Sequence, residues 1–103
     1  QNPRRVDGSP VKKESAFEKE VVKFLKSKGC DVFKMRYAPE GTPDRLFLKE
    51  GFWGMLEVKK SKDAPYQPLQ KEKIKRYNNM SYARATYPEN WDEVKAELEE
   101  ILA

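Results

Sequence analysis

The twenty residues from Gly41 to Lys60 constrain the fold of this chain more than any other stretch of its sequence. They contain two runs rich in apolar residues on either side of Glu50-Gly51, a pair typical of a tight turn, and so predict a β-hairpin. If these two residues form the centre of the turn, strand pairing places Asp44 opposite Glu57. Directly opposed side chains share one face of a sheet and lie about 4.5–5.5 Å apart at Cβ.

Lys59 follows Glu57 by two residues and should therefore point to the same face of the sheet. The hairpin thus gathers two carboxylates, from Asp44 and Glu57, and one ammonium group on one patch. Like charges that are directly opposed destabilise a sheet, so folding alone gives little reason for this arrangement. A bound divalent cation would give one.

Composition limits the chemistry that the chain can perform. Its 103 residues, 38% apolar and 37% charged, predict one small domain over residues 14–103 with a modest core. The absence of His excludes His-based catalysis, and the single Cys30 excludes an internal disulfide, which suggests the reducing cytoplasm. Carboxylate, lysine and metal chemistry remain. No apolar run approaches the roughly 18 residues of a membrane span.

The remaining pattern predicts the order α-β-β-β-α-β-α and a mixed sheet flanked by helices. Residues 1–13 are interpreted as a flexible basic arm, with a cloning remnant left open as the origin of part of it. The other expected elements are a helix over 15–28, a strand over 31–37, a helix over 68–79, a turn at Asn78-Asn79, a strand over 81–87 and a last helix from Asn90 or Asp92.

Glu18 has two interpretations. It follows Ser15 by three residues, which is the spacing of a capping box at a helix start. At 100° per residue it also lies on the shoulder of the apolar stripe of the first helix. A carboxylate there is partly desolvated and would benefit from a cation. The sequence leaves both interpretations open.

The second predicted helix displays several cations beside the carboxylate patch. With two lysines upstream, they form a candidate DNA-binding surface: Lys60, Lys62, Lys71, Lys73, Lys75 and Arg76. A solvated helix face is the alternative interpretation of such a charge run. Arg36, Arg45 and Arg84 are left as surface or phosphate-contact candidates.

Pro43-Asp44, followed after twelve residues by Glu57-Val58-Lys59, has the PD-(D/E)xK pattern. Over about residues 14–102 the chain resembles the VRR-NUC family of this nuclease superfamily, and it is similar to archaeal Holliday-junction resolvases. The stretches that carry the likeness are FEKEVVKFLKSKGCDVFK, GTPD, LEVKK and QPLQ. The resemblance implies a restriction-endonuclease-like fold.

The resemblance also implies a role for each site residue. Asp44 and Glu57 would ligate Mg²⁺ or Mn²⁺ together with the backbone carbonyl of Val58, because such hard cations prefer oxygen ligands. Glu18 stands at the leading acidic position of the family and would add a direct or water-mediated ligand. Lys59 would orient the attacking water or stabilise developing negative charge.

The family glutamine at the start of the next helix aligns with Gln70, where it would contact a water, Lys59 or the phosphate. Gln67 is a rival for this role, because the loop after Lys59 is slightly longer than the family pattern leads us to expect.

Together these features lead us to expect a metal-dependent DNA endonuclease that acts as a homodimer on branched DNA such as four-way junctions. One alternative is a flap or single-strand nuclease within a larger complex. Another is a DNA-binding module without catalytic activity.

Overall fold

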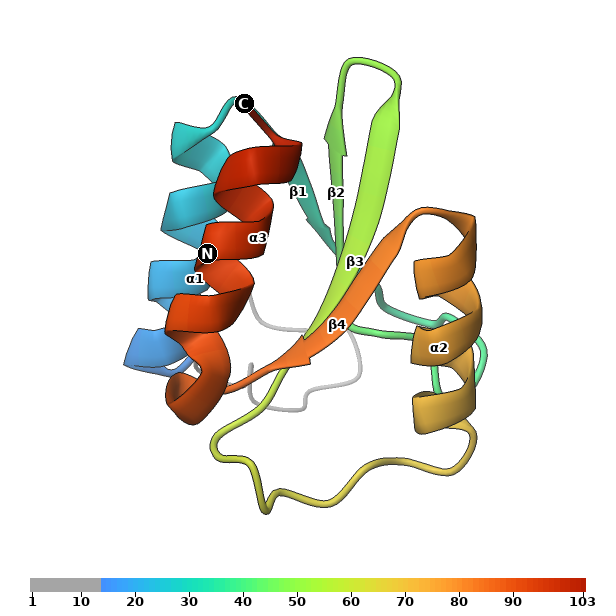
Figure 1. Ribbon diagram of the computed structural model, residues 1–103. Coiled ribbons are helices and arrows are strands. Elements are labelled where there is room, and N and C mark those ends of the chain that lie inside the picture. The colour runs from blue at the N-terminus through green and yellow to red at the C-terminus, as the bar shows by residue number, and fades with distance from the viewer. Residues whose placement is uncertain (1–13) are drawn as a thin grey trace, which may run out of the picture.

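A four-stranded sheet forms the centre of the computed structural model, which describes residues 14–103 (Figure 1). The strands lie side by side in the order β1 (Asp31–Lys34), β2 (Arg45–Lys49), β3 (Phe52–Val58) and β4 (Tyr82–Thr86). The pairs β1/β2 and β2/β3 are antiparallel, whereas β3 and β4 are parallel. The prediction of a mixed sheet with helices is therefore confirmed. The basic arm predicted over residues 1–13 lies outside the described residues.

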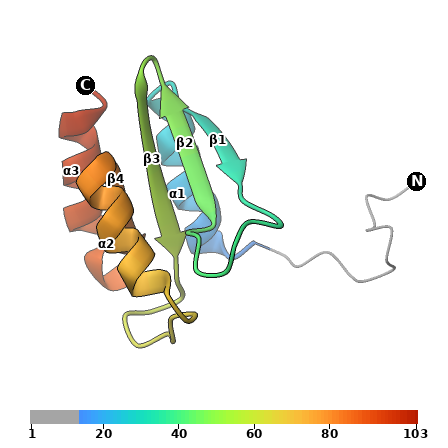
Figure 2. The same ribbon diagram turned by 90° about the vertical axis from the view of Figure 1, so that its right-hand side faces the viewer.

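Three helices pack against this sheet: α1 (Ala16–Ser27), α2 (Gln70–Met80) and α3 (Trp91–Ile101), the last preceded by a short 3₁₀ helix, η1 (Pro88–Asn90). Helices α1 and α3 lie on one face and α2 lies on the other (Figure 1). Parallel strands need a crossover connection, and α2 provides it between β3 and β4. Figure 2 shows that α2 covers only part of its face, since no helix of residues 14–103 lies in front of β1 and β2.

Helix α1 begins with a capping box, which is one of the two interpretations of Glu18 that the sequence leaves open. The Ser15 Oγ accepts a hydrogen bond of 3.1 Å from the Glu18 N–H, and Glu18 Oε1 accepts one of 2.9 Å from the Ser15 N–H. Val21 and Leu25 are fully buried and anchor the apolar face of the helix. Gly29 follows the helix with a φ of 89°, a conformation that glycine adopts without strain.

The central hairpin has the predicted register. Arg45 pairs with Leu56, and the turn residues Glu50 and Gly51 both have positive φ, 28° and 81°. Positive φ at both central residues is the requirement of a type I′ turn, whose twist matches that of the flanking strands. Continuing this pairing by one residue places Asp44 beside Glu57, at the end of the sheet where β2 begins and β3 ends.

The core lies between the sheet and the pair α1/α3. A Cβ at Gly54 would lie 2.3 Å from the ring of Phe47, so only glycine allows this ring to pack across β3. The buried core comprises Val21, Leu25, Cys30, Phe47, Leu56, Val58, Tyr82, Trp91, Val94, Leu98 and Leu102. It holds the end of the hairpin against α1, which positions the site described below.

The prediction of a turn at Asn78-Asn79 is wrong, because α2 continues through both residues to Met80. The Asn78 Oδ1 accepts a hydrogen bond of 3.1 Å from the Ala83 N–H, which ties the last turn of the helix to β4. Asn78 therefore makes a tertiary hydrogen bond to β4, and the chain does not reverse its direction at the asparagine pair.

Two predicted boundaries also differ from the structure. The first strand ends at Lys34 instead of residue 37, where Tyr37 has a φ of 59° and is 99% exposed. Helix α2 begins at Gln70 instead of Pro68, because Leu69 has a left-handed φ of 68° that no right-handed helix accommodates.

Within residues 14–103, none of the helices has the length and apolar content needed to cross a membrane.

Candidate active site

A cavity of about 650 Å³ lies at the end of the sheet where the hairpin strands approach α1. Five residues with an expected catalytic or metal-binding role line it: Glu18, Asp44, Glu57, Val58 and Lys59. They come from α1, from the residue before β2, and from β3 and the residue after it. Residues up to 41 positions apart in the chain therefore share one cavity.

The two hairpin carboxylates converge through backbone hydrogen bonds. The Asp44 N–H donates to Glu57 Oε1 at 3.0 Å, and the Val58 N–H donates to Asp44 Oδ1 at 3.4 Å. A backbone N–H group therefore holds each carboxylate, and the two carboxylates lie side by side. Because the N–H and C=O of one strand residue point to the same strand edge, the Val58 carbonyl also faces the β2 side.

This arrangement makes it costly to ionise both carboxyl groups. Burial and, to a smaller extent, the charge of Asp44 raise the pKa of Glu57 to about 7, although Lys59 opposes the shift. Burial also raises the pKa of Asp44, and the charge of Glu18 adds to this, while the Val58 N–H and Arg45 lower it. The pair therefore carries negative charge that its protein neighbours compensate only in part.

The raised pKa of Glu57 predicts an unusual pH dependence of stability in the metal-free protein. The folded state binds this proton more tightly than the unfolded chain, whose carboxyl has the ordinary pKa of 4.5. The stabilisation is therefore complete below about pH 4.5 and is lost as the pH rises through about 7. In EDTA, we expect the free energy of unfolding to fall by on the order of 2 kcal/mol between pH 5 and pH 8. Urea denaturation at each pH measures this free energy of unfolding.

Glu57→Gln is the control for this experiment, because it keeps the shape of the side chain and removes its titration. The difference in unfolding free energy between this variant and the parent should change with pH, and Mn²⁺ should restore the parent at pH 8. A difference that stays constant from pH 5 to pH 8 would contradict the assignment.

Lys59 is held in place on several sides. Its side chain is 7% exposed, and its Nζ lies 3.9 Å from Glu57 Oε2. The same Nζ donates a hydrogen bond of 2.8 Å to the Pro65 carbonyl and lies 4.3 Å from the centre of the Tyr66 ring. A charge fixed in this way can act on a ligand without first losing conformational freedom.

Gln70, the first residue of α2, is 1% exposed. Its Oε1 accepts a hydrogen bond of 3.3 Å from the Gln67 N–H, and a hydrogen bond from its side chain helps to lower the pKa of Glu57. Gln67 itself is exposed. The structure therefore places Gln70 beside the carboxylates, and Gln67 supports it through its backbone.

Glu18 lines the cavity, but one of its oxygens serves the capping box with Ser15. Among residues 14–103, no three His, Cys, Asp or Glu side chains are arranged to hold one metal ion. Asp44 and Glu57 form a two-carboxylate oxygen site instead. Such a site suits Mg²⁺, which is often held by one or two carboxylates and keeps several waters.

Arg45 and Lys34 lie near the site, a position that was not predicted for them from the sequence. Arg45 is 5% exposed, pairs with Glu14, and has no hydrogen-bond partner for its Nε among the described residues. It is therefore not a surface residue. Alternation along β2 directs it to the face opposite Asp44, toward α1, and this signal was present in the sequence. Lys34 lines the cavity as well.

The six candidate DNA-binding cations have different surroundings in the structure. Lys60 lines the cavity, whereas Lys71 and Lys75 line a separate pocket between α2 and β4. The Nζ of Lys73 donates a hydrogen bond to the Glu40 carbonyl, so this side chain supports the loop before β2. Lys62 and Arg76 are exposed.

Comparison with protein-family models finds none that matches the chain, and comparisons with curated proteins and with solved structures find no match either.

Proposed function

We propose that this protein is a metal-dependent nuclease that hydrolyses phosphodiester bonds in DNA, with a restriction-endonuclease-like fold of the PD-(D/E)xK, VRR-NUC type. One observation carries the proposal: the carboxylates of Asp44 and Glu57 and the ammonium of Lys59 converge in one cavity. Groups with perturbed pKa values that line one cavity are typical of catalytic sites.

Asp44, Glu57 and the Val58 carbonyl are the groups that would hold Mg²⁺ or Mn²⁺. Their oxygen donors match these hard cations, and the partly uncompensated charge of the carboxylate pair favours a cation. When bound, the ion would supply charge neutralisation at the phosphate and acidify a water molecule. Glu18 would take part through a water, since its carboxylate is engaged with Ser15.

The remaining side chains act on the substrate and on the carboxylates. Lys59 presents a fixed positive charge beside Glu57, where it would stabilise the negative charge that develops on the phosphate or orient the attacking water. Gln70 holds Glu57 from the α2 side. The backbone N–H groups of Asp44 and Val58 keep one oxygen of each carboxylate in place, leaving the others for ligation.

Branched DNA and a homodimer are the finer parts of the proposal. Lys60 at the cavity and the exposed Lys62 and Arg76 would contact phosphates around the scissile bond. Strands β1 and β2, which α2 does not cover (Figure 2), carry the exposed apolar residues Phe33 and Leu48, 48% and 38% exposed. Exposed apolar side chains of this kind favour association with a second copy.

A cleavage assay tests the proposed function. A four-way junction, a flap, a linear duplex and a single strand are each incubated with Mg²⁺, Mn²⁺ or EDTA. We expect incision with either metal, none in EDTA, and the fastest incision on the junction. Binding without incision under every condition would contradict the nuclease, and equal cutting of junction and linear duplex would remove the preference for branched DNA.

A further inference from the structure

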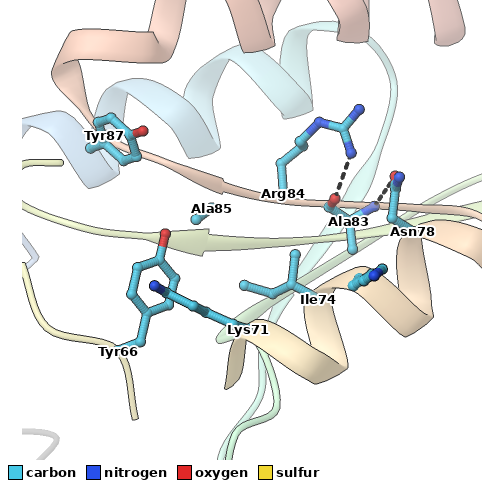
Figure 3. A pocket seen from close by; sticks show the side chains of 9 residues that line it. Tyr66, Lys71, Ile74, Asn78, Ala83, Arg84, Ala85 and Tyr87 are labelled. Carbon is cyan, nitrogen blue, oxygen red and sulfur yellow. Dashed lines mark hydrogen bonds between the residues drawn. The ribbon is translucent and has the colours of Figure 1, made fainter. Parts of the chain in front are cut away.

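A second cavity, of about 410 Å³, lies between α2 and β4 on the face of the sheet opposite the core (Figure 3). Ala83 and Ala85 of β4 line it, and their small side chains leave its floor flat and apolar. Ile74 of α2 forms part of the wall. Its size falls within the range of about 300–1,000 Å³ that is usual for small-ligand sites.

The charge of this cavity has one sign. Lys71, Lys75 and Arg84 line it, and none of the acidic residues within 14–103 does. Arg84 pairs with Glu97 at 3.2 Å, whereas neither lysine forms an ion pair with any residue of 14–103. Two uncompensated ammonium groups at the rim favour an anionic ligand.

Aromatic rings lie at one end of the cavity. Figure 3 shows Tyr66 and Tyr87 together there, with Arg84 and Asn78 toward the other end. Both tyrosines are only half-buried, so their rings remain accessible. An apolar floor, aromatic rings and adjacent cations are the combination that binds a nucleobase with its phosphate.

This cavity adjoins the candidate active site. The Nζ of Lys59 lies 4.3 Å and that of Lys71 4.9 Å from the centre of the Tyr66 ring, so this ring is close to lysines of both cavities. In the sheet, Ala85 pairs with Glu57 on the neighbouring strand, and neighbouring strands are about 4.8 Å apart. A nucleotide in the second cavity would therefore lie next to the phosphate acted on at the first.

We propose that the cavity between α2 and β4 binds the base of an unpaired nucleotide that flanks the scissile phosphate, with Tyr87 and Tyr66 contacting the base and Lys71 and Lys75 contacting phosphates. A base that stays paired within a duplex is stacked on both sides and cannot enter, so the site selects a nucleotide that is unpaired, or that becomes unpaired at the branch point of a junction, next to the cut. The position of the cut rests on the proposed nuclease function, whereas binding of the base does not.

Fluorescence of 2-aminopurine tests this inference without any cleavage. A short single strand carrying one 2-aminopurine, and a duplex in which the same base is paired, are titrated with the protein in EDTA. We expect quenching and binding of the single strand, and no quenching in the duplex. Tyr87→Leu should weaken binding of the single strand about tenfold and abolish quenching, whereas Tyr87→Phe should retain both.

Each control variant makes the same substitution, Tyr to Leu or Lys to Gln, at a position outside the cavity. Tyr37→Leu removes a fully exposed tyrosine that lines neither cavity, and it should change nothing. Lys75→Gln should lower the salt dependence of binding by about one phosphate contact, whereas Lys95→Gln, on α3, should not. Thermal unfolding establishes that each variant is folded.

The outcomes separate this inference from the proposed function. Unchanged quenching in folded Tyr87→Leu, or equal quenching by the paired base, would overturn the base site even if the protein cleaves DNA. Quenching that requires Tyr87, in a protein that cleaves nothing, would overturn the nuclease and retain the base site.

Discussion

Replacing Lys59 by Met should slow DNA cleavage by about a hundredfold to a thousandfold while leaving the fold intact. The substitution keeps an unbranched side chain and removes the ammonium that lies 4.3 Å from the centre of the Tyr66 ring and 3.9 Å from Glu57 Oε2. A positioned charge of this kind acts where negative charge develops, so its loss lowers the rate of the chemical step. Single-turnover cleavage with saturating protein measures that rate directly.

Two controls distinguish this role from metal binding and from DNA binding. Lys59 helps to lower the pKa of Glu57, so Mn²⁺ affinity must be compared at pH 8, where we expect little change. Lys60→Met removes an adjacent lysine of the same cavity and should weaken DNA binding with little effect on the single-turnover rate. Full cleavage by the Lys59→Met variant would exclude the assigned role.

The parts of the site that lie close in the hairpin could be predicted from the sequence. A two-residue turn determines the register, and the register determines which residues oppose each other. Counting from Glu50-Gly51 therefore places three side chains on one patch, those of Asp44, Glu57 and Lys59. The observed pairing agrees with this count. The spacing of Ser15 and Glu18 also offered the capping box of α1 as one of two interpretations, and the structure contains it.

The parts that depend on tertiary packing could not be predicted in this way. The loop between β3 and α2 brings Pro65 and Tyr66 onto Lys59, and no periodicity in the sequence indicates this contact. The choice between Gln67 and Gln70 depends on where α2 begins. That boundary is set by the left-handed conformation of Leu69, which has no local signature because leucine rarely adopts it.

The asparagine pair Asn78-Asn79 illustrates how tertiary contacts override local preference. Two adjacent asparagines favour a turn, yet α2 continues through both of them. The hydrogen bond between the Asn78 side chain and the Ala83 N–H compensates for this preference. Local propensity predicts such a boundary only when no neighbouring strand supplies a partner.

Replacing either hairpin carboxylate by its amide should have the largest effect on activity. Asp44→Asn and Glu57→Gln keep the shape of each side chain and its acceptor oxygen for the neighbouring backbone N–H. Each removes one of the two proposed charged ligands, and loss of metal-assisted stabilisation worth several kcal/mol corresponds to about a thousandfold or more in rate. The same single-turnover assay on the four-way junction measures this loss.

Glu18→Gln is the matched control for these two variants. Its amide oxygen can still cap the Ser15 N–H, and its contribution through a water should be worth about tenfold. Either Asp44→Asn or Glu57→Gln cleaving within tenfold of the parent would show that its carboxylate is dispensable for the reaction.

Calorimetric titration with Mn²⁺ at pH 8, without DNA, tests most directly whether Asp44 and Glu57 share one cation. We predict that the parent protein binds Mn²⁺ and that Asp44→Asn and Glu57→Gln each weaken this binding by about a hundredfold, while Glu18→Gln weakens it far less. Parent-like Mn²⁺ affinity in either hairpin variant would contradict the account.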